Sequence, residues 1–360
     1  LWIKIMAYSS IAKPTDYFNT LLYTGTGSGG SDRQLTGVGF QPDWTWIKNR
    51  NSAQEHVLVD AVRGATKSLD SSSTTAEETN DTRVGAFISD GFQLGSGSLQ
   101  NRVNGNGNGL VAWNWLGANG TASNSNGSTT STVSANTTAG FSIVSWTGTG
   151  SATTLGHGLS AIPKWYIVKN RSTGSTQWRV YHASLGATKH MALDATQVVG
   201  TASSIFNNTE PTSSVFSVGT DTAANNSGDS LIAYVFAEKK GYSKFGSYTG
   251  NGSTNGPFVY TGFRPAFVMT KRTDNTGDWA MMDNKRPNEF NVVQNYLKAQ
   301  ASDTEQTDDS FNIDIISNGW KARYNNGNYN ASGGSYIYMA FAENPFVAND
   351  SGTAVPVTAR

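Results

Sequence analysis

The chain contains no cysteine, so no disulfide can cross-link its domains. It is also poor in charge, because Asp, Glu, Lys and Arg make up 14% of the residues, whereas roughly 25% is typical of soluble domains. Lys and Arg together number 26, as do Asp and Glu, which leaves no net charge to attract nucleic acid or anionic lipid. No apolar run reaches the ~18 residues of a membrane helix. We therefore expect neither nucleic-acid binding nor membrane insertion.

We expect no export signal at the start of this sequence. Residues 1–5 are too short for a signal peptide and carry no cleavage site, and Met6 has the character of a natural start, which would make residues 1–5 an upstream extension. We expect a protein that folds in a cytoplasm and is used elsewhere.

The abundant residues are Gly, Ser, Thr and Asn, which suit turns and strands. They belong to a unit that occurs three times. Tyr-Thr-Gly-Thr-Gly at 23–27 returns as Trp-Thr-Gly-Thr-Gly at 146–150 and as Tyr-Thr-Gly-Asn-Gly at 248–252. A strand that begins at Pro42, Pro163 or Pro265 follows each copy, and an apolar strand closes each unit at 111–115, 232–236 and 337–341.

The spacing of these markers is nearly constant. The first aromatic residue precedes Lys48, Lys169 and Lys271 by 25, 23 and 23 residues, and each lysine precedes the middle of the closing strand by 65, 65 and 68. Three markers in one order at one spacing indicate three copies of one small domain.

The markers divide the chain into segments. We expect an N-terminal segment at 1–16, repeats at 17–117, 140–238 and 241–346, a Gly/Ser/Thr/Asn linker at 118–139, and a C-terminal tail at 347–360. The linker composition predicts a flexible coil that tethers repeat one loosely. Only Lys239 and Lys240 separate repeats two and three, so we expect those two repeats to pack together.

Period-two patterning predicts strands throughout. Trp44 and Trp46 share one strand face, and the closing strands place large residues on one face and small residues on the other. Asp90-Gly91 and Asn318-Gly319 are turn signals of β-hairpins. The predicted fold class is all-β, with three tandem antiparallel β-sandwich repeats (jelly-roll or concanavalin-like) of about 100 residues each.

The sequence shows no recognisable catalytic or metal-binding motif. The four histidines, His56, His157, His182 and His190, do not recur across the repeats and have no metal-ligand spacing. The acidic stretches lack the alternating pair of carboxylates on one strand that sandwich-fold glycosidases often use. We therefore predict no catalytic residue, no cofactor and no metal site.

The recurring polar feature is a cationic strand end. Its candidate residues are Lys48, Asn49, Arg50, Lys169, Asn170, Arg171, Lys271 and Arg272. Because Lys48 shares a face with Trp46, we expect it at the rim of the apolar face, paired with a carboxylate such as Asp60. We favour a structural salt bridge that is repeated with the domain. The alternative is a cationic and aromatic rim that contacts a glycan or a neighbouring subunit.

Several longer phrases carry a resemblance. Residues 241–252, 262–267 and 336–346, together with 39–44 and 47–50, resemble an uncharacterised family of tandem-repeat proteins of tailed bacteriophages, many of them marine. The resemblance covers about 17–346. It implies a virion-associated protein with sandwich domains in tail fibres, spikes or capsid decoration, and it supplies no catalytic residues.

Together these observations predict a non-enzymatic structural and adhesive protein, displayed on the outside of a phage particle and made in the host cytoplasm. The expected partners are other virion proteins, a host-surface glycan and further copies of the chain, since small domains without disulfides often self-associate. A trimer is the favoured homo-oligomer. The alternatives are a carbohydrate-binding module of a secreted or surface complex and a glycan-cleaving enzyme on a sandwich fold.

Overall fold

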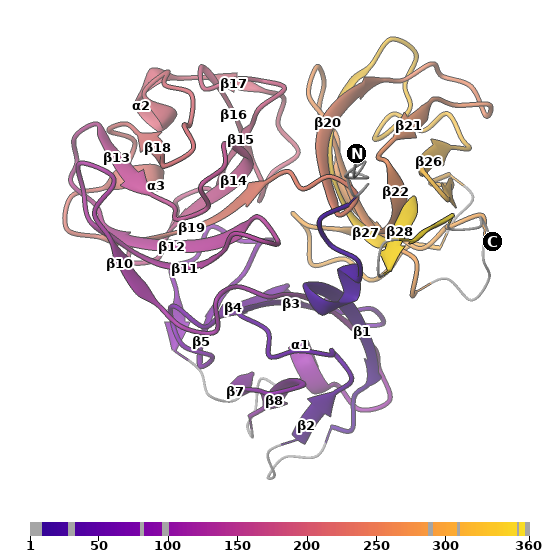
Figure 1. Ribbon diagram of the computed structural model, residues 1–360, viewed down its shortest axis with the longest axis horizontal. Helices are drawn as coiled ribbons and strands as arrows, with labels where there is room; N and C mark the ends of the chain where they lie inside the picture. Colours follow the sequence, from indigo (N-terminus) through magenta and orange to yellow (C-terminus); the bar gives the residue numbers. More distant parts are fainter. Residues whose placement is uncertain are drawn as a thin grey trace, which may run out of the picture.

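A computed structural model describes residues 9–27, 33–79, 83–95, 101–286, 291–307, 310–350 and 353–356. Antiparallel sheets make up nearly all of its regular structure, which confirms the all-β prediction. The sheets lie in three lobes around a common centre (Figure 1). We call these lobes module 1 (residues 17–117), module 2 (118–238) and module 3 (241–346).

Module 1 packs a six-stranded sheet, in the order β1-β9-β3-β4-β5-β6, against a smaller sheet, β2-β8-β7. Its elements are β1 (Phe18–Thr24), β2 (Arg33–Thr36), β3 (Trp44–Asn49), β4 (Val57–Asp60), β5 (Lys67–Leu69), β6 (Glu78–Thr79), β7 (Val84–Ile88), β8 (Gly91–Leu94), α1 (Asn101–Asn104) and β9 (Gly109–Trp115). The hairpin expected at Asp90-Gly91 joins β7 to β8.

Module 2 has an eight-stranded sheet, β10-β11-β12-β19-β14-β15-β16-β17, and a smaller sheet, β13-β18. Its elements are β10 (Ala122–Asn124), β11 (Ser131–Asn136), β12 (Phe141–Thr147), β13 (Thr153–Gly156), β14 (Pro163–Asn170), β15 (Arg179–His182), β16 (Lys189–Ala192), β17 (Gly200–Thr201), α2 (Ser203–Phe206), β18 (Val215–Val218), α3 (Thr222–Asn225) and β19 (Ser230–Ala237).

Module 3 has a five-stranded sheet, β20-β27-β22-β23-β24, and a smaller sheet, β21-β26-β25. Its elements are β20 (Ser243–Thr249), β21 (Phe258–Tyr260), β22 (Phe263–Arg272), β23 (Trp279–Asp283), β24 (Leu297–Lys298), β25 (Ile313–Ile316), β26 (Gly319–Ala322) and β27 (Ser335–Pro345). The hairpin expected at Asn318-Gly319 joins β25 to β26.

The larger sheets share one strand order, since β1-β9-β3-β4-β5 corresponds to β12-β19-β14-β15-β16 and to β20-β27-β22-β23-β24. Strand register then defines equivalent positions. Trp44, Trp165 and Phe267 lie opposite Trp115, Phe236 and Phe341, respectively. Residues at the same register position in the three sheets are therefore equivalent.

The larger sheets bury both of their faces. One face packs on the smaller sheet of the same module, and the other packs on the other two modules in a central cluster. The aromatic members of the central cluster include Trp44, Trp46, Trp113 and Trp115 from module 1, Trp165, Trp178, Tyr234 and Phe236 from module 2, and Phe267, Trp279 and Phe341 from module 3. The alternating tryptophans of β3 therefore face the neighbouring modules, whereas Ile47 faces the core within module 1.

Two expectations about the first repeat are wrong. The segment 118–139 is not a flexible coil, because β11 pairs with the outer edge of β12 and β10 pairs with β11. Its Ser, Thr and Val residues suit a strand as well as a loop, and Ser134 Oγ donates to Asp43 of module 1 at 3.1 Å. Module 1 is not loosely tethered either, since Trp44 stacks on Tyr234 of module 2 with ring centroids 4.2 Å apart.

The terminal segments contain further structure. Ile11 is buried in the central cluster ahead of the short 3₁₀ helix η1 (Pro14–Asp16), and Ser9 Oγ donates to the Lys240 carbonyl at 3.0 Å. In the tail, β28 (Val347–Asp350) pairs with β29 (Thr353–Pro356). Residues 1–8, including the expected start at Met6, lie outside the described residues. None of the helices described is long and apolar enough to cross a membrane.

Candidate functional site

The lysines of the predicted cationic strand ends are fully buried where two modules meet. Each Nζ donates to a backbone carbonyl of the next module, over distances of 3.1, 3.1 and 3.3 Å. The pairs are Lys48 to Ser302, Lys169 to Thr74, and Lys271 to Thr196. The three acceptors occupy equivalent positions, four residues after Lys298, Asp70 and Ala192, which end β24, directly follow β5 and end β16, respectively. One contact thus recurs in a cycle through the three modules.

Burial lowers the pKa of Lys48, Lys169 and Lys271 to about 8 in each case. Nearby carboxylates oppose this shift, for example Glu55 and Asp303 for Lys48. The ammonium groups bind carbonyl oxygens, and the expected salt bridge of Lys48 with Asp60 is absent. The Asp60 carboxylate instead accepts from the Arg63 guanidinium and, at 2.7 Å, from the Tyr234 hydroxyl of module 2. Arg63 lies three residues after Asp60, so its guanidinium pairs with that carboxylate in place of Lys48.

The asparagines next to these lysines hold turns. Asn49 Oδ1 accepts from the backbone N–H groups of Asn51 and Ser52, both at 3.0 Å. Asn170 repeats this arrangement with the N–H groups of residues 172 and 173, also at 3.0 Å. Both side chains are completely buried. They serve the local fold and do not face an external ligand.

The arginines form ion pairs across two of the three junctions. Arg50 binds Glu305 of module 3, and Arg171 binds Glu77 of module 1, each through two guanidinium nitrogens. At the junction of modules 2 and 3 the equivalent pair is Thr273 and Val199, which keeps only the backbone hydrogen bond, at 3.0 Å. Arg272 pairs within module 3, with Asp274 at 2.9 Å.

Sequence reasoning missed a second repeated contact, from a ring nitrogen to a carbonyl of the next module. His56 Nε2, Trp178 Nε1 and Trp279 Nε1 donate to the carbonyls of Lys298, Asp70 and Ala192 at 3.0, 3.0 and 2.8 Å. The rings follow the buried lysines by 8, 9 and 8 residues, a near-constant offset that could have revealed them. The change from Trp to His in module 1 hid the pattern.

Three of the four histidines are buried with a fixed tautomer. In His56, Nδ1 accepts from Trp46 Nε1 at 2.8 Å while Nε2 faces a carbonyl, so the neutral ring carries its proton on Nε2. His182 faces the Tyr338 carbonyl of module 3 and His157 faces the Thr212 carbonyl in the same way. Burial lowers the pKa of His56 to about 3 and that of His182 to about 4. These rings are packing elements.

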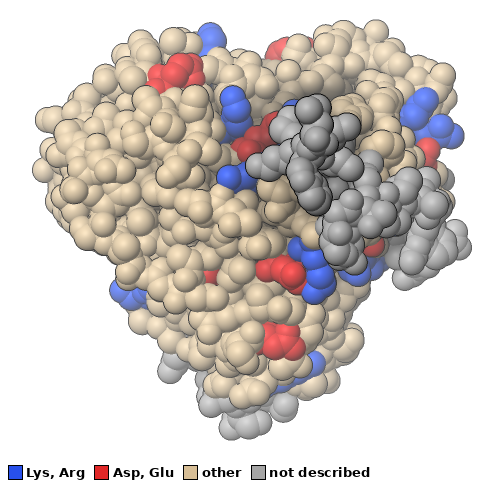
Figure 2. All heavy atoms as spheres, viewed as in Figure 1, with Lys and Arg blue, Asp and Glu red and all other residues tan. Residues whose placement is uncertain are grey.

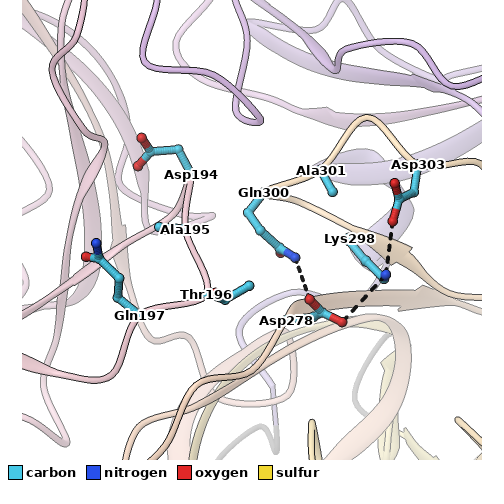
Figure 3. Close-up of a pocket in the computed structure, with 9 residues that line it drawn as sticks. All are labelled: Asp194, Ala195, Thr196, Gln197, Asp278, Lys298, Gln300, Ala301 and Asp303. Atoms are coloured by element: carbon cyan, nitrogen blue, oxygen red, sulfur yellow. Dashed lines mark hydrogen bonds and ion pairs between the residues drawn. The ribbon is translucent and has the colours of Figure 1, made fainter.

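An open cavity of about 470 Å³ lies between modules 2 and 3 (Figure 3). One wall is the loop after β16, with Asp194 and Gln197. The other comes from Asp278 just before β23, from Lys298 at the end of β24 and from the following loop with Asp303. Lys298 Nζ lies 3.0 Å from Asp303 and 3.8 Å from Asp278, and Gln300 Nε2 donates to Asp278 at 2.7 Å. The charged and amide side chains of this wall therefore pair with one another.

Asp194 stands apart from that set. Its carboxylate points away from Asp278 in Figure 3 and accepts from the Trp178 backbone N–H at 3.0 Å. Burial raises its pKa above the ordinary value. A raised pKa suits a general acid, but glycoside cleavage also needs a second carboxylate that faces the same bond. Asp278 and Asp303 are instead engaged with Lys298 and Gln300.

The described residues form no metal site, and comparison with known proteins identifies a family. Among the described residues, no group of three or more His, Cys, Asp or Glu side chains could hold a metal ion. No curated protein and no solved structure matches the chain. Residues 13–345 match a family described as a domain of unknown function (DUF7483). Since that match covers most of the 360 residues, the chain belongs to this family.

Proposed function

We propose that this protein is a non-enzymatic structural and adhesive component of a phage virion, displayed on the outside of the particle. The observation that carries the proposal is the way the modules are joined. Equivalent lysines, rings and backbone groups connect them in a closed cycle around a shared apolar centre. Such a body presents three similar lobes, which suits a threefold or near-threefold position in a symmetric assembly.

The groups that sequence analysis singled out support a structural role. The buried lysines and asparagines, together with Arg50 and Arg171, join modules or hold turns. The carboxylates that line the cavity between modules 2 and 3 already accept hydrogen bonds or pair with Lys298. The surface agrees with this proposal as well. Figure 2 shows Lys and Arg interspersed with Asp and Glu over a largely uncharged face, without a broad field of one sign. The resemblance of the repeated phrases to tailed-phage proteins is the reason for proposing a phage virion as the particle.

The test is the composition and surface of purified particles. Virions from a host that carries the corresponding phage would be banded in a density gradient and analysed by quantitative mass spectrometry. The chain should remain with the particle at a fixed copy number, and an antibody against the folded chain should decorate intact virions in electron micrographs. A chain that stays entirely in the unbanded lysate, while known capsid proteins band, would overturn the proposal.

Self-association remains a prediction within this proposal. The argument from small, separate domains is weaker than the sequence suggested, because the central cluster already joins three modules in one chain. Light scattering of the purified chain measures the outcome directly. A homo-trimer is expected, and a monodisperse monomer at micromolar concentration would contradict it.

A further inference from the structure

The smaller sheet of module 3 carries two exposed aromatic side chains. Phe258 and Tyr260 lie on the edge strand β21, and 47% and 54% of their surfaces are exposed. Strand alternation directs Val259 between them into the module core and leaves the two rings on the outer face. The sheet lies on the outside of module 3, away from the common centre (Figure 1). We call Phe258 and Tyr260 the aromatic platform.

The other modules show that the fold does not require these rings. Register places Gln34 and Thr36 of module 1, and Thr154 and Gly156 of module 2, at the positions of Phe258 and Tyr260. The module 1 residues are polar and exposed. In module 2 the chain covers its own face, because a Cβ at Gly156 would lie 1.9 Å from Asn124 Oδ1. Only module 3 combines aromatic rings with exposure at these positions.

The sheet is built to keep the two rings close to its surface. Gly319 lies opposite Tyr260, and a Cβ at Gly319 would come within 2.9 Å of the Phe258 ring. The ring of Phe258 therefore leans over the space that a side chain would fill. Lys321, opposite Phe258, donates to Asn255 Oδ1 at 2.6 Å, so the cation is held to one side by a neutral amide.

A polar cavity adjoins the platform. Tyr260 lines a hollow of about 330 Å³ together with Glu238, Ser243 and Lys244. Lys244 Nζ lies 2.8 Å from Glu238 Oε1, and 36% and 29% of these two side chains are exposed. The pair offers one cation and one anion to a ligand, and Lys240 also lines the hollow. The volume lies at the lower end of the ~300–1,000 Å³ typical of small-ligand sites.

From these observations we infer that module 3 binds a neutral glycan, with sugar rings stacked on Phe258 and Tyr260 and hydroxyl groups bonded to the Glu238–Lys244 pair. An aromatic ring favours the apolar C–H face of a sugar, and an ion pair offers both acceptors and donors to hydroxyls. Ring stacking and hydroxyl hydrogen bonds need no charge on the saccharide, so the proposed ligand is a neutral one. This inference rests on the adhesive part of the proposed function and locates it.

The test uses the full chain and neutral hexasaccharides of glucose, galactose and N-acetylglucosamine, each offered separately. Binding is measured by titration calorimetry, and saturation-transfer NMR identifies the sugar protons next to the rings. At least one saccharide should bind, with the strongest transfer at its C–H face. The double variant Phe258→Gln, Tyr260→Thr, which carries the module 1 residues, should bind about tenfold more weakly.

Two further variants keep the test decisive. Ile162→Thr removes an exposed apolar side chain elsewhere and should leave binding unchanged, while Glu238→Gln should weaken binding with no change in thermal stability. Failure of all three saccharides to bind overturns the inference, and so does undiminished binding by the double variant. If the platform instead mediates dimers that the double variant abolishes, the inference is also wrong. None of these outcomes depends on whether the chain occurs in virions, so the proposed function stands or falls separately.

Discussion

At the scale of single residues, burial of the three lysines is unfavourable, but their ammonium groups link neighbouring modules. Removing an ammonium group from water is unfavourable, which is why the pKa of Lys169 falls to about 8. The charge is retained because it binds two carbonyls from different chain segments, Thr176 in module 2 and Thr74 in module 1, at 2.6 and 3.1 Å. The lysine therefore links two modules through polar groups that would otherwise be left without partners.

Replacement of this lysine tests that link. Lys169→Met keeps the length and apolar stem of the side chain but leaves two carbonyls without their donor, so the free energy of unfolding should fall by about 2 kcal/mol. Urea denaturation followed by tryptophan fluorescence measures the change. Lys13→Met is the matched control, because the Lys13 side chain is 71% exposed, and it should change stability by less than ~0.5 kcal/mol. Equal stability of the two variants would contradict the linking role.

Residue chemistry also predicts a dependence on pH. Folding lowers the pKa of His56 from 6.5 to about 3, so between these values the unfolded chain binds a proton that the native chain does not. Stability is then lost as pH falls below 6.5, because protonated Nδ1 would face the Trp46 N–H. His56→Gln offers an acceptor and a donor without titrating. Its stability should fall less steeply with acid than that of the wild type, by up to about 1.4 kcal/mol per pH unit.

The comparison of the two proteins isolates His56 from other titrating groups. His182, whose pKa is also lowered, and Asp194, whose pKa is raised, are present in both proteins and cancel in the difference. Thermal unfolding at a series of pH values between neutrality and mild acid gives both slopes. Parallel slopes would show that His56 does not contribute.

At the scale of elements, the smaller sheets of modules 1 and 3 depend on glycine where two strands approach closely. Gly91 begins β8 with φ +147°, and a Cβ there would lie 2.0 Å from the Leu35 carbonyl oxygen. Gly319 holds the equivalent position in β26, where a Cβ would lie 2.1 Å from the Val259 carbonyl oxygen. Both obstacles are backbone atoms, which cannot move aside without separating the strands.

A methyl group at Gly91 should therefore disrupt the β2–β8 pairing. We expect Gly91→Ala to lower the free energy of unfolding by about 2–4 kcal/mol, mainly through strand separation. Gly120→Ala, where nothing lies within 4 Å of the added Cβ, should be nearly neutral. Hydrogen exchange provides the local measurement, since amides of β2 and β8 should lose protection before those of β3. Unchanged protection in β2 would contradict this account.

Sequence patterns predicted the elements better than their surroundings. Alternation located β3, β14 and β22, and turn chemistry located two hairpins, because both signals are local. The alternating tryptophans could not reveal that their face contacts other modules, since an apolar face has the same pattern against any core. Segment 118–139 was mistaken for a linker because Ser and Thr serve coil and strand alike, and pairing with the edge of β12 decides between them.

The candidate site was located by sequence but misjudged in part. The spacing of Lys48, Lys169 and Lys271 singled out a repeated feature, and the structure places all three at module junctions. Their acceptors are backbone carbonyls of distant loops, which carry no sequence signature. The sequence therefore predicts a carboxylate partner for Lys48, whereas its ammonium group donates to the carbonyls of Asn49 and Ser302.

At the scale of the whole molecule, the central cluster couples the modules. Trp44 packs on Tyr234 and Phe236 of module 2, and Trp113 packs on Phe267 of module 3. No module can unfold without exposing apolar surface of the other two. We expect a single cooperative transition in urea, and Trp44→Ala should shift it as a whole by about 3–5 kcal/mol. Fluorescence and far-ultraviolet circular dichroism should give coincident curves, whereas separate transitions would indicate independent modules.

Because the three modules belong to one chain, their surfaces can carry different residues, whereas the subunits of a homo-trimer are identical. A symmetric trimer of identical chains displays every surface feature three times. Here the position of Tyr260 is Thr36 in module 1 and Gly156 in module 2, so the aromatic platform occurs once per molecule. Each chain is then monovalent for whatever binds there. Firm attachment would depend on how many chains one scaffold presents, because avidity grows with the effective concentration of tethered sites.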